Sequence, residues 1–295
     1  MPAEIETRAV RIRSVDAPHL HYVPAGNLEI AVWEWPGSDP PLLLAHATGF
    51  HGRCWDHIVR QFPGRRAISV EFRGHGRSSK PAPPIPWADF ALDILAVARH
   101  YAIRDAIGVG HSMGGHSLVS AVIQQPEIFS ALVLVDPVIF PPEFYSRGAP
   151  PDASYIQRRR NRWASPQEMF DRFRSRLPFS AWQPEALKNY CDYALLPDGD
   201  SFVLACPPVT EAAIYGLCNA PENNLYSGIA VIAQPVTVLR AGAKHKGTVL
   251  DLNASPTAAD LASKFARGRD VYLPDHNHYI PMEAPELVTA EIAHF

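Results

Sequence analysis

The sequence has few cysteines, and their positions suggest neither a metal site nor a disulfide framework. Its 295 residues include four, spread widely along the chain: Cys54, Cys191, Cys206 and Cys218. Because cysteine ligands of a metal usually stand close together in sequence, this spread favours reduced, buried thiols, which are typical of a cytoplasmic protein.

Targeting and membrane signals are also missing. Residues 1–13 mix charged and apolar side chains and lack the continuous apolar stretch of a signal peptide. No other segment is apolar over a length that could cross a membrane. The formal net charge of -3 provides no basic surface for nucleic acid. We therefore expect a cytoplasmic protein whose partners include neither membranes nor nucleic acids.

The composition and length are those of a large folded unit. Hydrophobic residues make up 47% of the chain and charged residues 19%, which is ordinary for a soluble globular protein. Since 295 residues exceed one typical domain, we expect a single α/β core that carries an inserted subdomain.

Apolar runs followed by glycine-rich turns and helical patterns predict a parallel sheet. The runs His19–Val23 and Leu28–Trp35 flank a short Gly/Asn turn, which predicts a hairpin at the sheet edge. Buried strands are predicted at Leu42–Ala45, Ala67–Phe72, Ala106–Val109 and Ala131–Val135, and helices at Trp87–His100 and His116–Gln125.

This pattern breaks after Pro137, where prolines and aromatic residues cluster. We assign residues 141–234 to an inserted cap, with helices opened by prolines at Pro166–Leu177 and Pro184–Tyr193. Residues 1–140 and 235–295 form the predicted core. Its second part is expected to contain strands at Val236–Arg240 and Asp270–Leu273 and helices at Ala258–Ala266 and Pro285–Ala293.

The most informative motif is Gly-x-Ser-x-Gly around Ser112. An apolar strand enters it and a helix leaves it, so the serine is expected on a sharp strand-to-helix turn with its hydroxyl exposed at the strand end. Gly110 and Gly114 have no Cβ atoms that would collide there.

A serine hydroxyl is a weak nucleophile at neutral pH and needs a histidine base, oriented by an acid. Two histidines, His276 and His278, lie in the loop between the last predicted strand and the last helix, and both are candidates. Residues 241–245, where an acid commonly follows the strand, contain no carboxylate. Asp136, directly after Ala131–Val135, is the best alternative, and Asp251 is held in reserve.

Such a nucleophile also needs hydrogen-bond donors for the oxygen that becomes negative during the reaction. The backbone N–H of Met113, next to the serine, and that of Thr48, in the loop after Leu42–Ala45, are the candidate donors. His46 is expected to shape this loop. The histidines near it are too loosely spaced for a metal site, and no cofactor is expected.

Four segments together resemble the α/β-hydrolase superfamily: Ala45–Phe50, Arg73–Ser78, Gly110–Gly115 and His278–Glu283. The resemblance implies an α/β fold with a mostly parallel eight-stranded sheet flanked by helices, and an inserted, mainly helical cap. It implies Ser112 as nucleophile, His278 as base, and Thr48 and Met113 as oxyanion donors. Members that place the acid after the sixth strand imply Asp136.

The resemblance leads us to expect a serine hydrolase that cleaves a small carboxylic ester. An acyl-CoA thioesterase is the first alternative, because the basic run Arg158–Arg162 could meet phosphates. A carbon-carbon bond hydrolase and a non-catalytic ligand receptor on the same fold are further alternatives. The sequence does not define an oligomeric state, and a homodimer is compatible with it.

Overall fold

The computed structural model describes residues 17–145, 152–242 and 251–295. The amino-terminal residues and residues 243–245, both discussed above, lie outside these ranges. Within the described ranges, no helix is long and apolar enough to cross a membrane.

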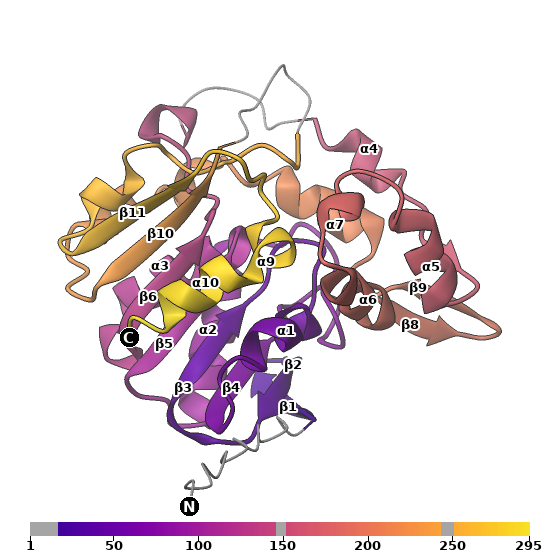
Figure 1. Ribbon diagram of the computed structural model, residues 1–295, viewed down its shortest axis with the longest axis horizontal. Helices are drawn as coiled ribbons and strands as arrows, with labels where there is room; N and C mark the ends of the chain where they lie inside the picture. Colours follow the sequence, from indigo (N-terminus) through magenta and orange to yellow (C-terminus); the bar gives the residue numbers. More distant parts are fainter. Residues whose placement is uncertain (1–16, 146–151, 243–250) are drawn as a thin grey trace, which may run out of the picture.

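Eight strands form one sheet, as predicted (Figure 1). Its order is β1-β2-β4-β3-β5-β6-β10-β11. The predicted hairpin is confirmed, since β1 and β2 pair antiparallel; β2 and β4 do so too, and every other neighbouring pair is parallel. The strands are His19–Ala25 (β1), Leu28–Trp35 (β2), Ser38–Ala45 (β3), Arg65–Val70 (β4), Ala106–His111 (β5), Phe129–Val135 (β6), Val236–Ala241 (β10) and Gly268–Leu273 (β11).

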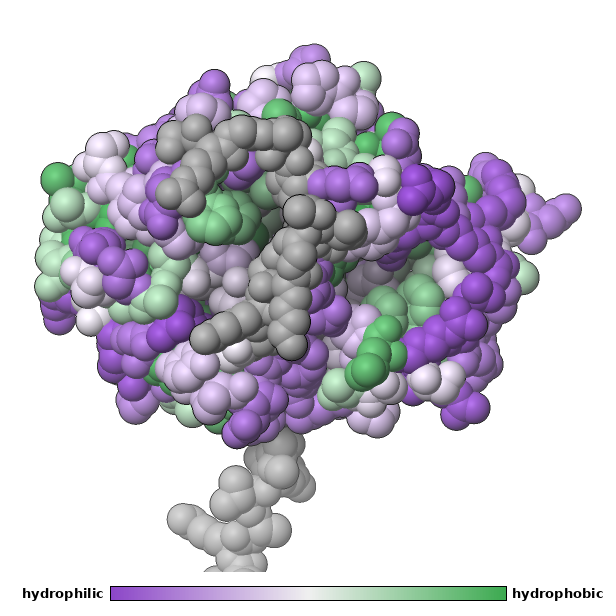
Figure 2. Space-filling view, turned by 90° about the horizontal axis from the view of Figure 1, so that it is seen from above, coloured by the Kyte–Doolittle hydropathy of each residue, from purple (hydrophilic) through white to green (hydrophobic). Residues whose placement is uncertain are grey.

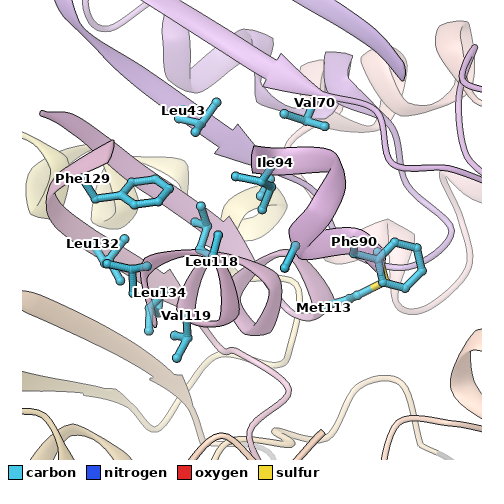
Figure 3. Packing of buried hydrophobic residues seen from close by; sticks show 14 of the residues in the cluster. Leu43, Val70, Phe90, Ile94, Met113, Leu118, Val119, Phe129, Leu132 and Leu134 are labelled. Carbon is cyan, nitrogen blue, oxygen red and sulfur yellow. The ribbon is translucent and has the colours of Figure 1, made fainter. Parts of the chain in front are cut away.

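Helices cover both faces of the sheet. Because successive residues of a strand point to opposite faces, each face has its own apolar cluster with the helices on that side. In β3, Leu43 packs in the cluster with α2 (Ala88–His100) and α3 (Met113–Gln124), which Figure 3 shows. Leu42 and Leu44 pack on the other face with α1 (Asp56–Val59) and α10 (Pro285–Ile292). Burial on both faces explains why the central strands are continuous apolar runs.

The segment between β6 and β10 contains helices, as predicted. It also contains a small sheet, which was not predicted. Its helices are Ser154–Gln157 (α4), Pro166–Phe173 (α5), Pro184–Tyr193 (α6), Pro208–Tyr215 (α7) and Tyr226–Ile229 (α8). The strands Arg162–Trp163 (β7), Leu195–Asp198 (β8) and Ser201–Leu204 (β9) form a three-stranded antiparallel sheet. Helix α6 has the predicted bounds, whereas α5 ends at Phe173, four residues before the predicted end at Leu177. Leu177 itself precedes Pro178, a position at which helical backbone is disfavoured.

The predicted helix Ala258–Ala266 is wrong. Only a short 3-10 turn, Leu261–Lys264, occurs there, and the backbone is extended again at Phe265. The N–H of Ala258 donates to the Ile139 carbonyl, so this residue is tied to the core instead of starting a helix. With β11 beginning at Gly268, too few residues remain for a regular helix.

The inserted segment packs against the two loops that carry candidate site residues. Its buried Trp182, Leu187 and Tyr190 share an apolar cluster with Phe50, in the loop after β3, and with Tyr279, beside His278. Figure 1 shows α4 to α7 with β8 and β9 gathered on one side of the sheet. On the face shown in Figure 2, hydrophilic and hydrophobic residues are interspersed. The division into core and cap stays a prediction.

Candidate active site

Ser112 lies on the sharp turn between β5 and α3. Its backbone φ of 58° and ψ of -120° lie outside the common regions for residues other than glycine. The turn requires close approach of α3 to β3: a Cβ atom on Gly114 would lie 2.1 Å from the Ala45 carbonyl oxygen. Glycine at this position therefore lets the helix start directly after the serine, three residues earlier than predicted.

Ser112, His278 and Asp136 form one hydrogen-bonded chain. The Ser112 hydroxyl oxygen lies 2.9 Å from His278 Nε2, and Asp136 Oδ2 lies 2.7 Å from His278 Nδ1. All three side chains are buried, although they come from three separate loops at the carboxyl ends of β5, β6 and β11. This geometry lets the imidazole accept a proton from the hydroxyl at Nε2 while its Nδ1–H donates a hydrogen bond to the carboxylate.

The second oxygen of Asp136 is held by three donors. Oδ1 accepts hydrogen bonds from the Ser255 hydroxyl at 2.6 Å, the Thr257 hydroxyl at 3.0 Å and the Ala241 N–H at 3.0 Å. The sequence did not point to Ser255 or Thr257, because they lie in an irregular stretch whose path no periodic pattern predicts.

His278 is also positioned through its backbone. Its N–H donates to the Asn253 carbonyl at 3.0 Å, and its carbonyl lies 2.8 Å from His111 Nε2. Because a carbonyl oxygen only accepts, His111 donates through Nε2. Burial and the nearby His278 ring lower the pKa of His111 well below its usual value, so the ring is neutral. His111 stands inside the Gly-x-Ser-x-Gly motif, yet nothing in the motif indicates this contact.

The competing candidates lie elsewhere. His276 faces Glu283, with Nδ1 3.5 Å from the carboxylate. Asp251 accepts hydrogen bonds from the backbone and side chain of Asn253. In the described part of the chain, neither of them contacts Ser112 or His278 through a hydrogen bond.

The two candidate oxyanion donors lie side by side. The Thr48 hydroxyl donates to the Met113 sulfur at 3.2 Å, which joins the loop after β3 to the start of α3. Among the described residues, neither the Thr48 N–H nor the Met113 N–H has a hydrogen-bond acceptor. Their role as oxyanion donors stays a prediction.

His46 shapes the loop, as expected. Its Nε2 accepts from the Phe72 N–H at 3.2 Å, so Nδ1 carries the proton and donates to the Ala47 carbonyl at 2.8 Å. Burial lowers the pKa of His46 to about 4, although the Ala47 carbonyl opposes the change. The neutral ring therefore ties this loop to the end of β4.

A cavity of about 320 Å³ adjoins the site. One side is formed by the loop after β3 and by Tyr279; the rest comes from the inserted segment and residues 251–253. Its lining comprises Thr48, Gly49, Phe50, Tyr155, Arg159, Phe173, Pro178, Phe179, Tyr190, Glu211, Tyr215, Asp251, Leu252, Asn253 and Tyr279. The wall thus combines apolar rings with four phenol hydroxyls and charged groups.

The basic run Arg158–Arg162 contains three arginines that are already paired. Arg159 pairs with Glu211, Arg160 with Glu168 and Arg162 with Asp198. Each carboxylate belongs to the inserted segment itself, so most of the positive charge of this run is balanced within that segment.

The fold and this constellation are those of an α/β hydrolase, and the chain belongs to that family: the family model described as "Alpha/beta hydrolase family" matches residues 42–291. The chain is 32% identical over 115 residues to 2-(acetamidomethylene)succinate hydrolase from Mesorhizobium japonicum, an alignment covering 39% of this chain and 41% of that protein. It is 31% identical over 133 residues to the type I acyl-CoA thioesterase mpaH from Penicillium brevicompactum, covering 43% and 29%.

Among solved structures, E-2-(acetamidomethylene)succinate hydrolase superposes with a TM-score of 0.73 at 21% identity, covering 94% of this chain and 98% of the other. At that identity the likeness concerns the fold. The chain aligns with less than half of the length of these curated relatives.

Proposed function

We propose that this protein is a serine hydrolase that cleaves carboxylic esters through an acyl-serine intermediate. The observation that carries the proposal is the hydrogen-bonded chain from the Ser112 hydroxyl through His278 to Asp136, with separations of 2.9 and 2.7 Å. A buried hydroxyl, imidazole and carboxylate in this order are the components of acyl transfer by serine.

In the first half of the proposed reaction, Ser112 Oγ attacks the ester carbonyl carbon while His278 Nε2 takes the hydroxyl proton. Asp136 holds Nδ1 and stabilises the imidazolium that forms. The tetrahedral intermediate collapses when the C–O bond to the alcohol breaks, and His278 gives its proton to the departing oxygen. Ser112 is left as an ester of the acyl group.

In the second half, water attacks the acyl carbon and gives a proton to His278 Nε2. The bond to Ser112 Oγ breaks, and the proton returns to this oxygen, so that the acid is released and the enzyme is restored. The backbone N–H groups of Thr48 and Met113 stabilise the negative oxygen in both halves, each contributing about 3 kcal/mol to the transition state.

The test is turnover of a short p-nitrophenyl ester by Ser112→Ala. We expect kcat to fall to the background level, because Ser112 Oγ is the group that lies 2.9 Å from His278 Nε2 and would form the acyl bond. Ser120→Ala, in the same helix and away from the hydrogen-bonded chain, is the matched control and should keep wild-type turnover. Unchanged turnover by Ser112→Ala would refute the proposal.

Thioester hydrolysis is a second candidate, supported by the partial similarity to an acyl-CoA thioesterase. The pairing of Arg159, Arg160 and Arg162 argues against capture of the CoA phosphates by this run. Hydrolysis of acyl-CoA with a KM that rises strongly with salt would favour the thioesterase, since exposed charge contacts are screened. A preference for simple esters at every salt concentration would favour the esterase.

A further inference from the structure

An ion pair lies in the wall of the cavity beside the candidate site. Arg159, which follows α4, donates through Nη1 to both carboxylate oxygens of Glu211 in α7, at 2.7 and 2.5 Å. Both residues line the cavity together with Thr48. The Glu211 side chain is only 3% exposed and that of Arg159 is 26% exposed. A largely buried ion pair of this kind adds little net stability compared with apolar residues of the same size.

The carboxylate of this pair lies against the candidate oxyanion loop. A Cβ atom on Gly49 would be 2.6 Å from Glu211 Oε1, and the Gly49 φ of 80° favours glycine as well. Since Gly49 directly follows Thr48, the charge of Glu211 lies close to the place where the substrate carbonyl is expected.

The cavity also offers hydrogen-bond donors for a neutral group. The Arg159 guanidinium has five N–H donors, and the pair with Glu211 uses those of Nη1. The phenol of Tyr190 lines the same cavity as Arg159. The phenol of Tyr279 belongs to the same wall, as does that of Tyr215, whose hydroxyl donates to the Thr48 carbonyl at 3.5 Å. An amide or carbonyl oxygen of a substrate would therefore meet several donors.

A negatively charged group would meet a less favourable environment. Two carboxylates, of Glu211 and Asp251, and one guanidinium, of Arg159, are the charged groups of the described lining, so its formal net charge is -1. Charges in a partly buried cavity are screened only weakly by salt. Without Glu211, Arg159 would instead present an unpaired positive charge to the cavity.

We propose that Glu211 is a specificity-determining residue: by neutralising Arg159 it makes the cavity accept a neutral hydrogen-bonding group of the substrate and disfavour a carboxylate. This inference rests on the ester hydrolysis proposed above. It predicts which substrates are preferred and which single change reverses the preference.

The first measurement compares matched substrates with the wild-type protein at pH 8. p-Nitrophenyl hydrogen adipate has a terminal carboxylate, and p-nitrophenyl adipamate has an amide of nearly the same size. A second pair, 4-carboxyphenyl and 4-carbamoylphenyl butyrate, has the same two groups on the departing alcohol. Each kcat/KM is normalised to the rate of alkaline hydrolysis. In the pair whose carboxylate or amide group enters the cavity, we expect the normalised kcat/KM of the amide member to exceed that of the carboxylate member roughly tenfold or more.

The second measurement repeats the comparison with variants. Glu211→Gln keeps the size of the side chain and frees the charge of Arg159, so the carboxylate-to-amide ratio should rise by roughly tenfold or more. The double variant Arg159→Met with Glu211→Gln removes both charges and should lose this rise. Glu222→Gln, at an exposed position elsewhere in the inserted segment, is the matched control and should keep the wild-type ratio.

Two results would overturn the inference: wild-type protein that hydrolyses the carboxylate member of both pairs as fast as the amide, or a ratio in Glu211→Gln within about twofold of wild type. The wild-type comparison stands even where a variant does not fold. Absence of Ser112-dependent hydrolysis of all four esters is a different outcome, which contradicts the proposed function itself.

Discussion

Asp136 engages different groups with its two oxygens. Oδ2 meets the imidazole of His278, while Oδ1 accepts from Ser255, Thr257 and the backbone of Ala241. The three donors fix the rotation of the carboxylate, so that the remaining oxygen is aimed at Nδ1. A carboxylate held in this way sets both the tautomer and the orientation of the candidate base.

Replacing Asp136 by Asn should therefore lower kcat for ester hydrolysis by roughly 10³- to 10⁴-fold, because an amide that donates to Nδ1 leaves the wrong tautomer for a base. Labelling of Ser112 by a fluorophosphonate should slow as well. Asp251→Asn should reduce kcat far less, since Asp251 bonds to Asn253. If Asp251→Asn had the larger effect, Asp136 would not be the acid.

His111 is expected to position His278 through the hydrogen bond to its carbonyl. His111→Phe removes this donor and should lower kcat roughly tenfold with little change in KM. His111→Gln can supply an N–H at a similar distance and should restore most of the loss. Equal kcat for wild type and the Phe variant, measured on one ester, would show that the contact has no positioning role.

At this scale the sequence identified the residues that belong to a motif. Ser112 and its two glycines form a recognisable turn, and Asp136 follows directly on an apolar strand. Ser255, Thr257 and Asn253 could not be found in this way, because their positions depend on how an irregular stretch after β10 crosses the strand ends. Such a path is set by tertiary contacts and leaves no periodic pattern in the sequence.

At the scale of elements, the close approach of α3 to β3 determines where the serine lies. Gly114→Ala would place a Cβ atom 2.1 Å from the Ala45 carbonyl oxygen. Since the backbone must shift to relieve this clash, the free energy of unfolding should fall by about 2 to 4 kcal/mol.

Urea denaturation measures this change. Gly216→Ala is the control: its added Cβ atom would have no neighbour closer than 3.4 Å, and the free energy of unfolding should change by about 0.5 kcal/mol or less. Equal effects of the two substitutions would mean that α3 does not need glycine at this point.

Helices with a regular apolar period and a proline at their start were predicted well. Short paired strands without such a signal at their start were not predicted. Helix α6 begins at Pro184 and ends at Tyr193, as predicted from the proline at its first turn. The hairpin β8–β9 was not predicted, although its two-residue loop, Gly199-Asp200, is a turn signal. The insertion was expected to be mainly helical, so no strands were predicted on either side of this turn.

At the scale of the whole molecule, several histidines are buried in the neutral form. Burial lowers the pKa of His46 and of His116 to about 4, from 6.5 in an unfolded chain. Because the folded pKa is the lower one, the unfolded chain binds protons first as the pH falls. Stability is therefore fully present above pH 6.5 and is lost progressively between pH 6.5 and 4.

Each of these two histidines should lower the free energy of unfolding by about 2 kcal/mol between pH 7.5 and 5. His116→Gln can keep a donor toward the Asn223 carbonyl and cannot titrate, so its stability should depend less on pH. His100→Gln, at an exposed position, should retain the wild-type dependence. Urea denaturation at the two pH values makes the comparison, and identical slopes for all three proteins would contradict this account.

The sheet was predictable as a whole because its central strands are buried on both faces and its turns contain glycine. Composition and motifs alone also led to three predictions that the fold does not test. A cytoplasmic location, a small ester or thioester as partner and the homodimer stay predictions, since none of them depends on a contact within the described residues.

The most direct test of the central claim is the site of acylation. Wild-type protein is mixed with a p-nitrophenyl ester, quenched in acid during turnover and digested for mass spectrometry. We expect the peptide that contains Ser112 to gain the mass of the acyl group, and the same peptide of Ser112→Ala to remain unmodified. Turnover without any acylated Ser112 peptide, or acylation at another residue, would contradict the account.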